Sequence, residues 1–319
     1  MKKKNQWIKL NIVLVVILAL IAAPVTSYGL GAQRLSDAVK NLQNAMVARQ
    51  DTAVVYFYSW DDFTKDNAMR DELFYAACSE EIADSYNTGA YLKSNVKGCE
   101  VSTQKIGTDP DRWKVVFTNI TYRTTAEQEA EFDARLQEVM AGLELEDKTE
   151  YEKCSAIYDY ITSHVVYDTE AYQAHLAGDD SDYDMAYTAY SALINGRAVC
   201  QGYATLFYAM CRYAGLEVLM VDGIALGQDG WGDHAWNMVR IDGYWYQADP
   251  TWDADPSFMG YRYFLKGTDT FKNHRLNLDY TQDAFTSTHV MPVNSYKNAV
   301  NENPLIRLFK MLKELILGK

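Results

Sequence analysis

Three short sequence blocks place a cysteine, a histidine and an aspartate in a fixed order, and this order constrains the fold more than any other feature of the chain. The blocks span residues 196–204, 232–237 and 248–253. Within them, Cys200, His234 and Asp249 are separated by 34 and 15 residues. A thiol, an imidazole and a carboxylate are what a nucleophile, its base and the group that orients the base require. The sequence therefore predicts a fold that brings the three blocks together.

The first block predicts a loop that turns into a helix at the cysteine. Gly196 and Gly202 lie on either side of Cys200, and a largely apolar run follows from 203 to 214. The N-terminus of a helix favours a thiolate over a thiol. In this arrangement His234 would hold the proton from Cys200 and deliver it to a leaving group, while Asp249 would fix the imidazole tautomer.

The second and third blocks predict a β-hairpin. Residues 235–241 alternate, Asp242 and Gly243 form a tight turn, and the aromatic-rich stretch 244–249 follows. His234 would then open the first strand and Asp249 would close the second. Because antiparallel pairing brings the two ends of a hairpin together, the two side chains are expected to lie side by side.

The three blocks resemble those of the transglutaminase-like superfamily, a papain-related group with a circularly shifted core. The family pattern is a Cys before a Gly-Tyr-Ala helix, a His-Ala-Trp-Asn strand and an Asp-Pro-Thr-Trp-Asp strand end, and every position is filled here. Residues 156–161 and 166–168 resemble the helix and the Tyr-Asp segment that precede the nucleophile in bacterial members. The resemblance covers about residues 150–265. It implies an α+β, papain-like core, with Cys200 at a helix N-terminus packed on an antiparallel sheet.

The same resemblance implies a thiol enzyme that attacks amide or ester carbonyls of proteins or peptides and needs no cofactor. The acyl-enzyme on Cys200 would be resolved by an amine, giving transglutamination, or by water, giving hydrolysis, and the residues do not choose between them. The backbone N–H of Cys200 is the expected oxyanion donor. Gln201, Tyr190 and Trp236 are weaker candidates for oxyanion or substrate contacts. The alternative is a non-enzymatic cell-surface binding or scaffold module that retains the fold.

The N-terminus has the pattern of a secretory signal. Lysines at 2–4 and 9 precede an apolar stretch of about 14 residues from 10 to 23, shorter than the roughly 20 residues of a spanning helix. We therefore predict a signal peptide over residues 1–32 and a secreted or cell-surface protein, with an uncleaved N-terminal anchor as the alternative. The source is expected to be bacterial.

Five cysteines in an exported chain leave at least one unpaired. The unpaired one is expected to be Cys200. Cys78 with Cys99, and Cys154 with Cys211, are candidate disulfides, and four reduced thiols are the other possibility.

The charge balance excludes non-specific nucleic-acid binding. The chain has 30 basic and 43 acidic residues, a net charge of −13, and about −17 without the four lysines of the signal. The acidic stretch Asp179, Asp180, Asp182 and Asp184 lacks the glycine and the terminal glutamate of a calcium loop, and is predicted to be a solvated loop. Zinc patterns such as Cys-x-x-Cys or His-Glu-x-x-His are absent from the sequence. We predict no metal site.

The remaining sequence divides into three regions. Residues 33–123 are predicted to form an N-terminal α+β region of unknown role, with helices at 35–47 and 67–83 and strands at 52–58, 100–106 and 112–122. Residues 124–270 form the predicted catalytic domain, with helices at 126–145 and 148–164 and a last strand at 262–265. Residues 271–319 are a C-terminal extension. Its basic amphipathic helix at 304–317 is expected to pack on the body or, alternatively, to contact an anionic membrane surface.

Overall fold

The computed structural model describes residues 35–58, 68–83, 85–108, 112–179, 181–227, 230–254 and 262–296. The predicted signal at 1–32, the predicted helix at 304–317 and Asp180 of the acidic stretch lie outside these residues. Among the described helices, none has the length and apolar character needed to span a bilayer.

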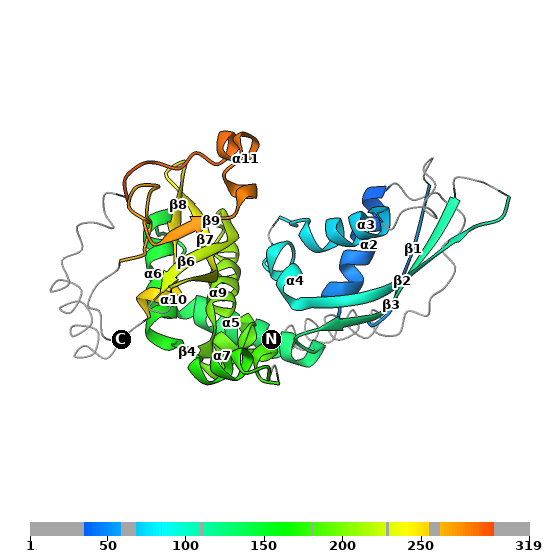
Figure 1. The fold of residues 1–319 in the computed structure, drawn as a ribbon, viewed down its shortest axis with the longest axis horizontal. Helices are drawn as coiled ribbons and strands as arrows, with labels where there is room; N and C mark the ends of the chain where they lie inside the picture. The colour runs from blue at the N-terminus through cyan, green and yellow to red at the C-terminus, as the bar shows by residue number, and fades with distance from the viewer. Residues whose placement is uncertain are drawn as a thin grey trace, which may run out of the picture.

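The first group of elements, which we call the N-terminal lobe, covers residues 35–122 (Figure 1). Its elements are α2 (Leu35–Val47), β1 (Ala53–Tyr58), α3 (Ala68–Ser79), α4 (Ala90–Asn95), β2 (Val96–Lys105) and β3 (Arg112–Tyr122). The three strands form an antiparallel sheet in the order β1-β3-β2. The helices and strands predicted for this region are present, whereas the short helix α4 was not predicted.

The N-terminal lobe has its own hydrophobic core. Trp113, Val115 and Phe117 alternate along β3 and are buried, as expected for one face of a strand. They belong to the same cluster as Leu42 and Met46 of α2. Helix and sheet thus cover each other's apolar faces in this lobe.

The second group, the C-terminal lobe, covers residues 126–296 and carries the three sequence blocks. Its helical elements are α5 (Ala126–Gly142), α6 (Glu150–His164), α7 (Thr169–Leu176), α8 (Tyr183–Ala186), η1 (Ser191–Asn195), α9 (Cys200–Tyr213), α10 (Pro250–Asp253), η2 (Leu278–Tyr280) and α11 (Asp283–Thr288). Its strands are β4 (Val166–Tyr167), β5 (Arg197–Ala198), β6 (Val218–Gly227), β7 (Gly230–Ile241), β8 (Tyr244–Ala248) and β9 (His274–Leu276). The lobe therefore has the mixed helix and sheet content of an α+β fold, as predicted.

The predicted hairpin is present as β7 and β8. Asp242 and Gly243 both have positive φ, 51° and 85°, which is the geometry of a type I′ turn. Pairing runs from Ile241 opposite Tyr244 to Asn237 opposite Ala248.

One expectation about this hairpin is wrong. His234 does not open its strand, because β7 begins at Gly230 and continues as the partner of β6. Continuing the β7–β8 register places Asp249 opposite Trp236, so His234 reaches the carboxylate diagonally.

The four-stranded sheet has the order β8-β7-β6-β9 and carries α9 on one face. Asn237 of β7 fixes the helix to the sheet, because its amide donates to the carbonyl oxygen of Ala204 at 3.0 Å. β6 was not predicted. The helix that begins at Cys200 is thereby held over the strand that carries His234.

The predicted strand at 262–265 is also wrong. This segment bends, and only an isolated bridge between Gln247 and Lys266 follows it. The physical reason is the side chain of Asp253, whose two oxygens accept the N–H groups of Arg262 and Tyr263 at 2.8 and 2.9 Å. The sheet instead gains β9, which lies beyond residue 270, where the catalytic domain was predicted to end.

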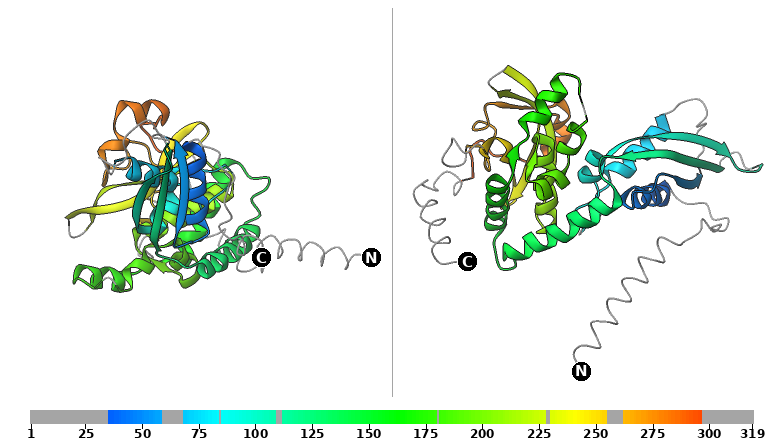
Figure 2. Two further views of the ribbon diagram at one scale, coloured as in Figure 1. Left: turned by 90° about the vertical axis from the view of Figure 1, so that its right-hand side faces the viewer. Right: turned by 90° about the horizontal axis from the view of Figure 1, so that it is seen from below.

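The two lobes meet along α9 and its surroundings. Glu81 of the N-terminal lobe accepts a hydrogen bond from Tyr208 at 2.9 Å and forms an ion pair with Arg212 at 3.2 Å. Arg123 pairs with Asp184 of the acidic stretch and lies over the ring of Tyr187. Helix α5, the first helix of the C-terminal lobe, begins next to the N-terminal lobe and leads from it to the rest of its own lobe (Figure 2).

All five cysteines are free thiols. Cys78 interacts electrostatically with Cys99, and Cys154 forms a hydrogen bond with Cys211, so both predicted pairs are neighbours in the fold. The structure thus shows the reduced form of both pairs.

Candidate functional site

Cys200 is the first residue of α9, as predicted. Val199 before it is extended and serves as the N-cap, and its N–H donates to the carbonyl of Ala186 at 2.9 Å. A Cβ on Gly202 would lie 2.8 Å from the carbonyl oxygen of Ala186 and 2.9 Å from that of Thr188. Glycine is therefore required for the first turn to pack against this loop. The thiol-bearing residue itself is half-buried.

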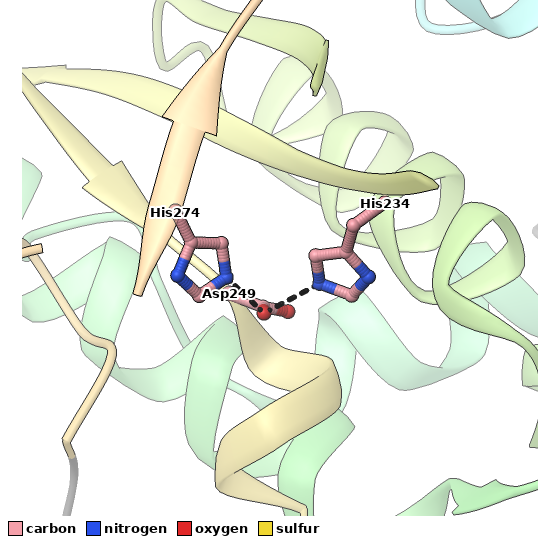
Figure 3. Close-up of side chains that lie close together, drawn as sticks. All are labelled: His234, Asp249 and His274. Carbon is pink, nitrogen blue, oxygen red and sulfur yellow. Dashed lines mark hydrogen bonds and ion pairs between the residues drawn. The ribbon is translucent and has the colours of Figure 1, made fainter. Parts of the chain in front are cut away.

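His234 connects the thiol to the carboxylate. Its Nε2 lies 2.8 Å from Oδ2 of Asp249, which leaves Nδ1 for the hydrogen bond with Cys200 (Figure 3). Burial by itself would lower the pKa of His234. The charge of Asp249 and the hydrogen bonds with Asp249 and Cys200 outweigh burial and raise this pKa to about 10. At neutral pH the ring is accordingly an imidazolium.

Asp249 is fully buried and fixed on all sides. It caps α10 through Oδ1, which accepts the N–H of Thr251 at 2.9 Å, and its carbonyl oxygen accepts the hydroxyl of Tyr158 at 2.7 Å. Burial would raise the pKa of this carboxyl. The charge of His234 and the hydrogen bonds from His234 and His274 hold the pKa well below its usual range. Asp249 is therefore a carboxylate at any pH at which the site works.

His274 is a site residue that the sequence did not indicate. It lies on the three-residue strand β9, beyond the region of family resemblance, and its Nε2 is 3.0 Å from the same Oδ2 of Asp249 (Figure 3). Sequence pattern offers little signal here, because a single histidine on a short strand is an ordinary core residue. Only the tertiary pairing of β9 with β6 brings it to Asp249.

The same side chains could in principle converge on a metal ion. The possible ligand atoms of His234, Asp249 and His274 all lie within 4.8 Å of one another. Both Nε2–Oδ2 separations, 2.8 and 3.0 Å, are those of direct hydrogen bonds. A metal ion would have to replace both Nε2 protons. We therefore describe the three side chains as a hydrogen-bonded cluster.

Asp253, the last residue of the third block, is linked to this cluster by hydrogen bonds. It accepts the hydroxyl of Tyr158 at 2.7 Å as well as two backbone N–H groups. Burial raises the pKa of Asp253 to about 6, although these hydrogen bonds act to lower it. The same Tyr158 hydroxyl lies 2.7 Å from the backbone carbonyl oxygen of Asp249, so its single proton is shared between the two acceptors and holds both residues to helix α6.

The weaker candidates lie in different places. Trp236 is fully buried, donates from Nε1 to Gln247 at 3.0 Å and packs its ring against that of His234. The hydroxyl of Tyr190 donates to Glu131 at 2.6 Å. Gln201 is the second residue of α9, next to the thiol. Trp236 therefore supports the imidazole, and the Tyr190 hydroxyl is held by α5.

Two tyrosines, Tyr167 and Tyr187, lie near enough to Cys200 to interact with it electrostatically. Burial is the main reason that the pKa values of Tyr167 and Tyr187 are raised, and the electrostatic interaction of each with Cys200 adds to this. Tyr167 is 38% exposed. The surroundings of the partly exposed thiol therefore include aromatic side chains.

Residues 137–250 match the family model of the transglutaminase-like superfamily. The chain is also 35% identical over 127 residues to the kyphoscoliosis peptidases of Mus musculus and Homo sapiens. This alignment covers 37% of the chain and 18% of each relative, so the chain spans about a fifth of their length. All three site residues of the sequence blocks fall inside the matched range.

Solved structures give weaker similarities. A transglutaminase crystal structure aligns with a TM-score of 0.34 and 17% identity, covering 63% of this chain and 51% of that one. A protein described as a putative cysteine protease from Cytophaga hutchinsonii aligns with a TM-score of 0.29 and 16% identity, covering 49% of this chain and 65% of its own.

Proposed function

We propose that this chain, which belongs to the transglutaminase-like superfamily through residues 137–250, is a thiol enzyme. It transfers acyl groups from protein or peptide amides. The thiolate of Cys200 attacks the carbonyl carbon, and the C–N bond breaks as the imidazolium of His234 gives its proton to the leaving amine. The product is a thioester on Cys200. An amine or a water molecule, deprotonated by His234, then attacks the thioester and releases Cys200.

The observation that carries this proposal is the position of His234 between the thiol and a buried carboxylate. An imidazole with a pKa of about 10 stays protonated beside Cys200 at neutral pH, and this charge stabilises a thiolate. The buried Asp249 keeps the ring in the tautomer and orientation that the reaction needs.

The oxyanion formed during attack would be stabilised by the start of α9. The first four N–H groups of a helix have no acceptor within the helix, and the N–H of Cys200 is among them. This donor and the positive end of the helix dipole would both face the developing charge.

The experiment that tests this function is a screen of glutamine-containing acyl-donor peptides, read by mass spectrometry with and without a primary amine. Amide exchange with the amine indicates transglutamination, cleavage or deamidation without it indicates hydrolysis, and Cys200→Ala is expected to abolish both. Trapping of a peptide thioester on Cys200 would support either reaction. If no peptide reacts and no thioester forms, a non-enzymatic binding or scaffold module is the better account.

We also propose that the protein is secreted or held at the cell surface. The support is the charged and apolar pattern at residues 2–23 of the sequence. N-terminal sequencing of the mature protein, recovered from the medium or from the cell surface, tests this. A protein recovered from the cytosol with its original N-terminus would contradict it.

A further inference from the structure

Asp249 carries two imidazoles on one oxygen. Oδ2 lies 2.8 Å from Nε2 of His234 and 3.0 Å from Nε2 of His274, while Oδ1 accepts the N–H of Thr251 at 2.9 Å. We propose that His274 is a positioning residue, whose Nε2–H holds the Asp249 carboxylate in the orientation that aligns His234 with Cys200. This inference rests on the proposed function, because it assigns a role in the same site.

The charge state of the cluster defines which group donates. Asp249 is a carboxylate and can only accept, so the proton between it and His274 belongs to Nε2 of His274. Nδ1 of His274 is buried without a hydrogen-bond partner in the part of the chain that the structure describes. His274 is therefore the neutral Nε2–H tautomer beside a charged His234.

Packing fixes the ring of His274. It stacks on Phe271 with centroids 3.9 Å apart and lies within 4.7 to 5.5 Å of the rings of Trp252, Trp236 and Tyr263. Its side chain is fully buried. A donor that cannot rotate holds its acceptor in place, and this is what a catalytic orientation requires.

The backbone brings this ring to the carboxylate through a close approach of β9 to β6. His274 pairs with Ala225, and Leu276 pairs with Gly223. A Cβ at Gly223 would overlap the carbonyl oxygen of Arg275, so glycine permits the approach. β9 is only three residues long, and delivery of His274 gives it a function beyond extending the sheet.

Loss of the Nε2–H donor of His274 is expected to affect the reaction through the orientation of the Asp249 carboxylate. With His274 present, Oδ2 is held from two sides and Oδ1 by the N–H of Thr251, so the carboxylate cannot turn without breaking three hydrogen bonds. Without this donor the carboxylate gains freedom, and the imidazole of His234 moves with it. A misplacement of about 1 Å in such a site reduces the rate by up to about 100-fold.

The test measures the rate constant for alkylation of Cys200 by iodoacetamide from pH 5 to 9 in three variants and the wild type, together with the melting temperature. His274→Phe keeps an aromatic ring but removes the donor. We expect its labelling rate at neutral pH to be about 10 to 100-fold lower, and its labelling to be displaced towards the pH range in which a free thiol ionises, about 8.5.

His274→Gln retains an N–H donor near the position of Nε2, and its labelling rate should stay within a few-fold of the wild type. Phe271→Leu removes the stacked ring but no donor, and should lower the melting temperature without displacing the pH profile.

The possible outcomes separate the two proposals. Fast, selective alkylation in the wild type and equally fast alkylation in His274→Phe would overturn the role of His274 and leave the proposed function standing. The same holds if His274→Gln and Phe271→Leu lose as much rate as His274→Phe, because the effect would then follow packing. A wild-type Cys200 that reacts no faster than a free thiol would overturn the proposed function, and this inference with it.

A second measurement does not depend on reactivity. ¹⁵N NMR of the five imidazoles at neutral pH should show His274 as the neutral Nε2–H tautomer and His234 protonated on both nitrogens. A neutral His274 ring with its proton on Nδ1 would contradict the assigned hydrogen bond, and a ring protonated on both nitrogens would contradict its neutral state.

Discussion

At the scale of single residues, the surroundings of Cys200 differ from those of the buried thiols of Cys78 and Cys211. Burial raises the pKa of Cys78 to about 12, and it raises that of Cys211 as well, so both stay protonated and unreactive. Cys200 instead lies at a helix N-terminus with a charged imidazole as its neighbour. At neutral pH Cys200 is therefore expected to react, and the buried thiols of Cys78 and Cys211 are not.

The charge on His234 predicts how stability depends on pH. Its folded-state pKa of about 10 is above the unfolded value of about 6.5, so folding favours the protonated ring. The stabilisation is fully present below about pH 6.5 and is lost as the pH rises through 10, with a slope of at most about 1.4 kcal/mol per pH unit. Thermal melts of wild type and His234→Gln between about pH 8.5 and 10, where a free thiol is ionised as well, should show the steeper decline in the wild type. Parallel declines in the two proteins would mean that His234 is not charged in the folded state.

At the scale of elements, helix α9 links the sheet to the loop that precedes the nucleophile. Its residues from 202 to 211 are all buried, and Asn237 ties it to β7. The position of Cys200 is consequently set by how closely the first turn approaches residues 186–198.

Gly202 is the point at which this approach can be tested. In Gly202→Ala the new Cβ would lie 2.7 Å from the Cβ of Ala198 and under 3 Å from two carbonyl oxygens, so the helix start must shift. We expect a loss of about 1–3 kcal/mol in the free energy of unfolding and a fall in Cys200 alkylation. The matched control is Gly142→Ala at the end of α5, where no atom lies within 4 Å and helix propensity favours alanine. Equal effects in a urea melt would contradict the packing account.

Local pattern was sufficient for some elements and not for others. The β7–β8 hairpin could be predicted because alternation and an Asp-Gly turn are short-range signals, and the same holds for the helix that begins at Cys200. β9 was missed because it is three residues long and its pairing with β6 connects segments about 50 residues apart. β6 was missed although it is ten residues long and pairs with the next strand, β7. His274 was missed with β9. The predicted strand at 262–265 failed because side-chain hydrogen bonds from Asp253 bend that segment.

At the scale of the whole molecule, the N-terminal lobe is bound to the helix that begins at Cys200. Glu81 contacts Tyr208 and Arg212, both on α9, and α4 also packs against this helix. The lobe therefore contacts α9, the helix that begins at Cys200, through both α4 and Glu81.

Removal of this contact should weaken the whole structure. In Glu81→Ala the buried hydroxyl of Tyr208 loses its nearer acceptor, and Arg212 loses its carboxylate partner while keeping its hydrogen bond to the carbonyl of Ile82. We expect a cost of about 1–3 kcal/mol. Glu138→Ala is the control, because its ion pair with Arg135 is exposed and such pairs contribute about 0–1 kcal/mol. The free energy of unfolding from urea titration checks both. A Glu81 variant as stable as the control would show that the two lobes are not joined through this residue.

The central claim is that Cys200 and His234 form a thiolate–imidazolium pair oriented by Asp249. The most direct test is the pH dependence of iodoacetamide labelling, mapped to each cysteine by mass spectrometry. We predict that the native protein is labelled at Cys200 at and below neutral pH, that folded Cys200→Ala is not labelled there, and that His234→Gln is labelled only as the pH approaches about 8.5, where a free thiol ionises. Labelling of His234→Gln with the same pH profile as the wild type would contradict the account.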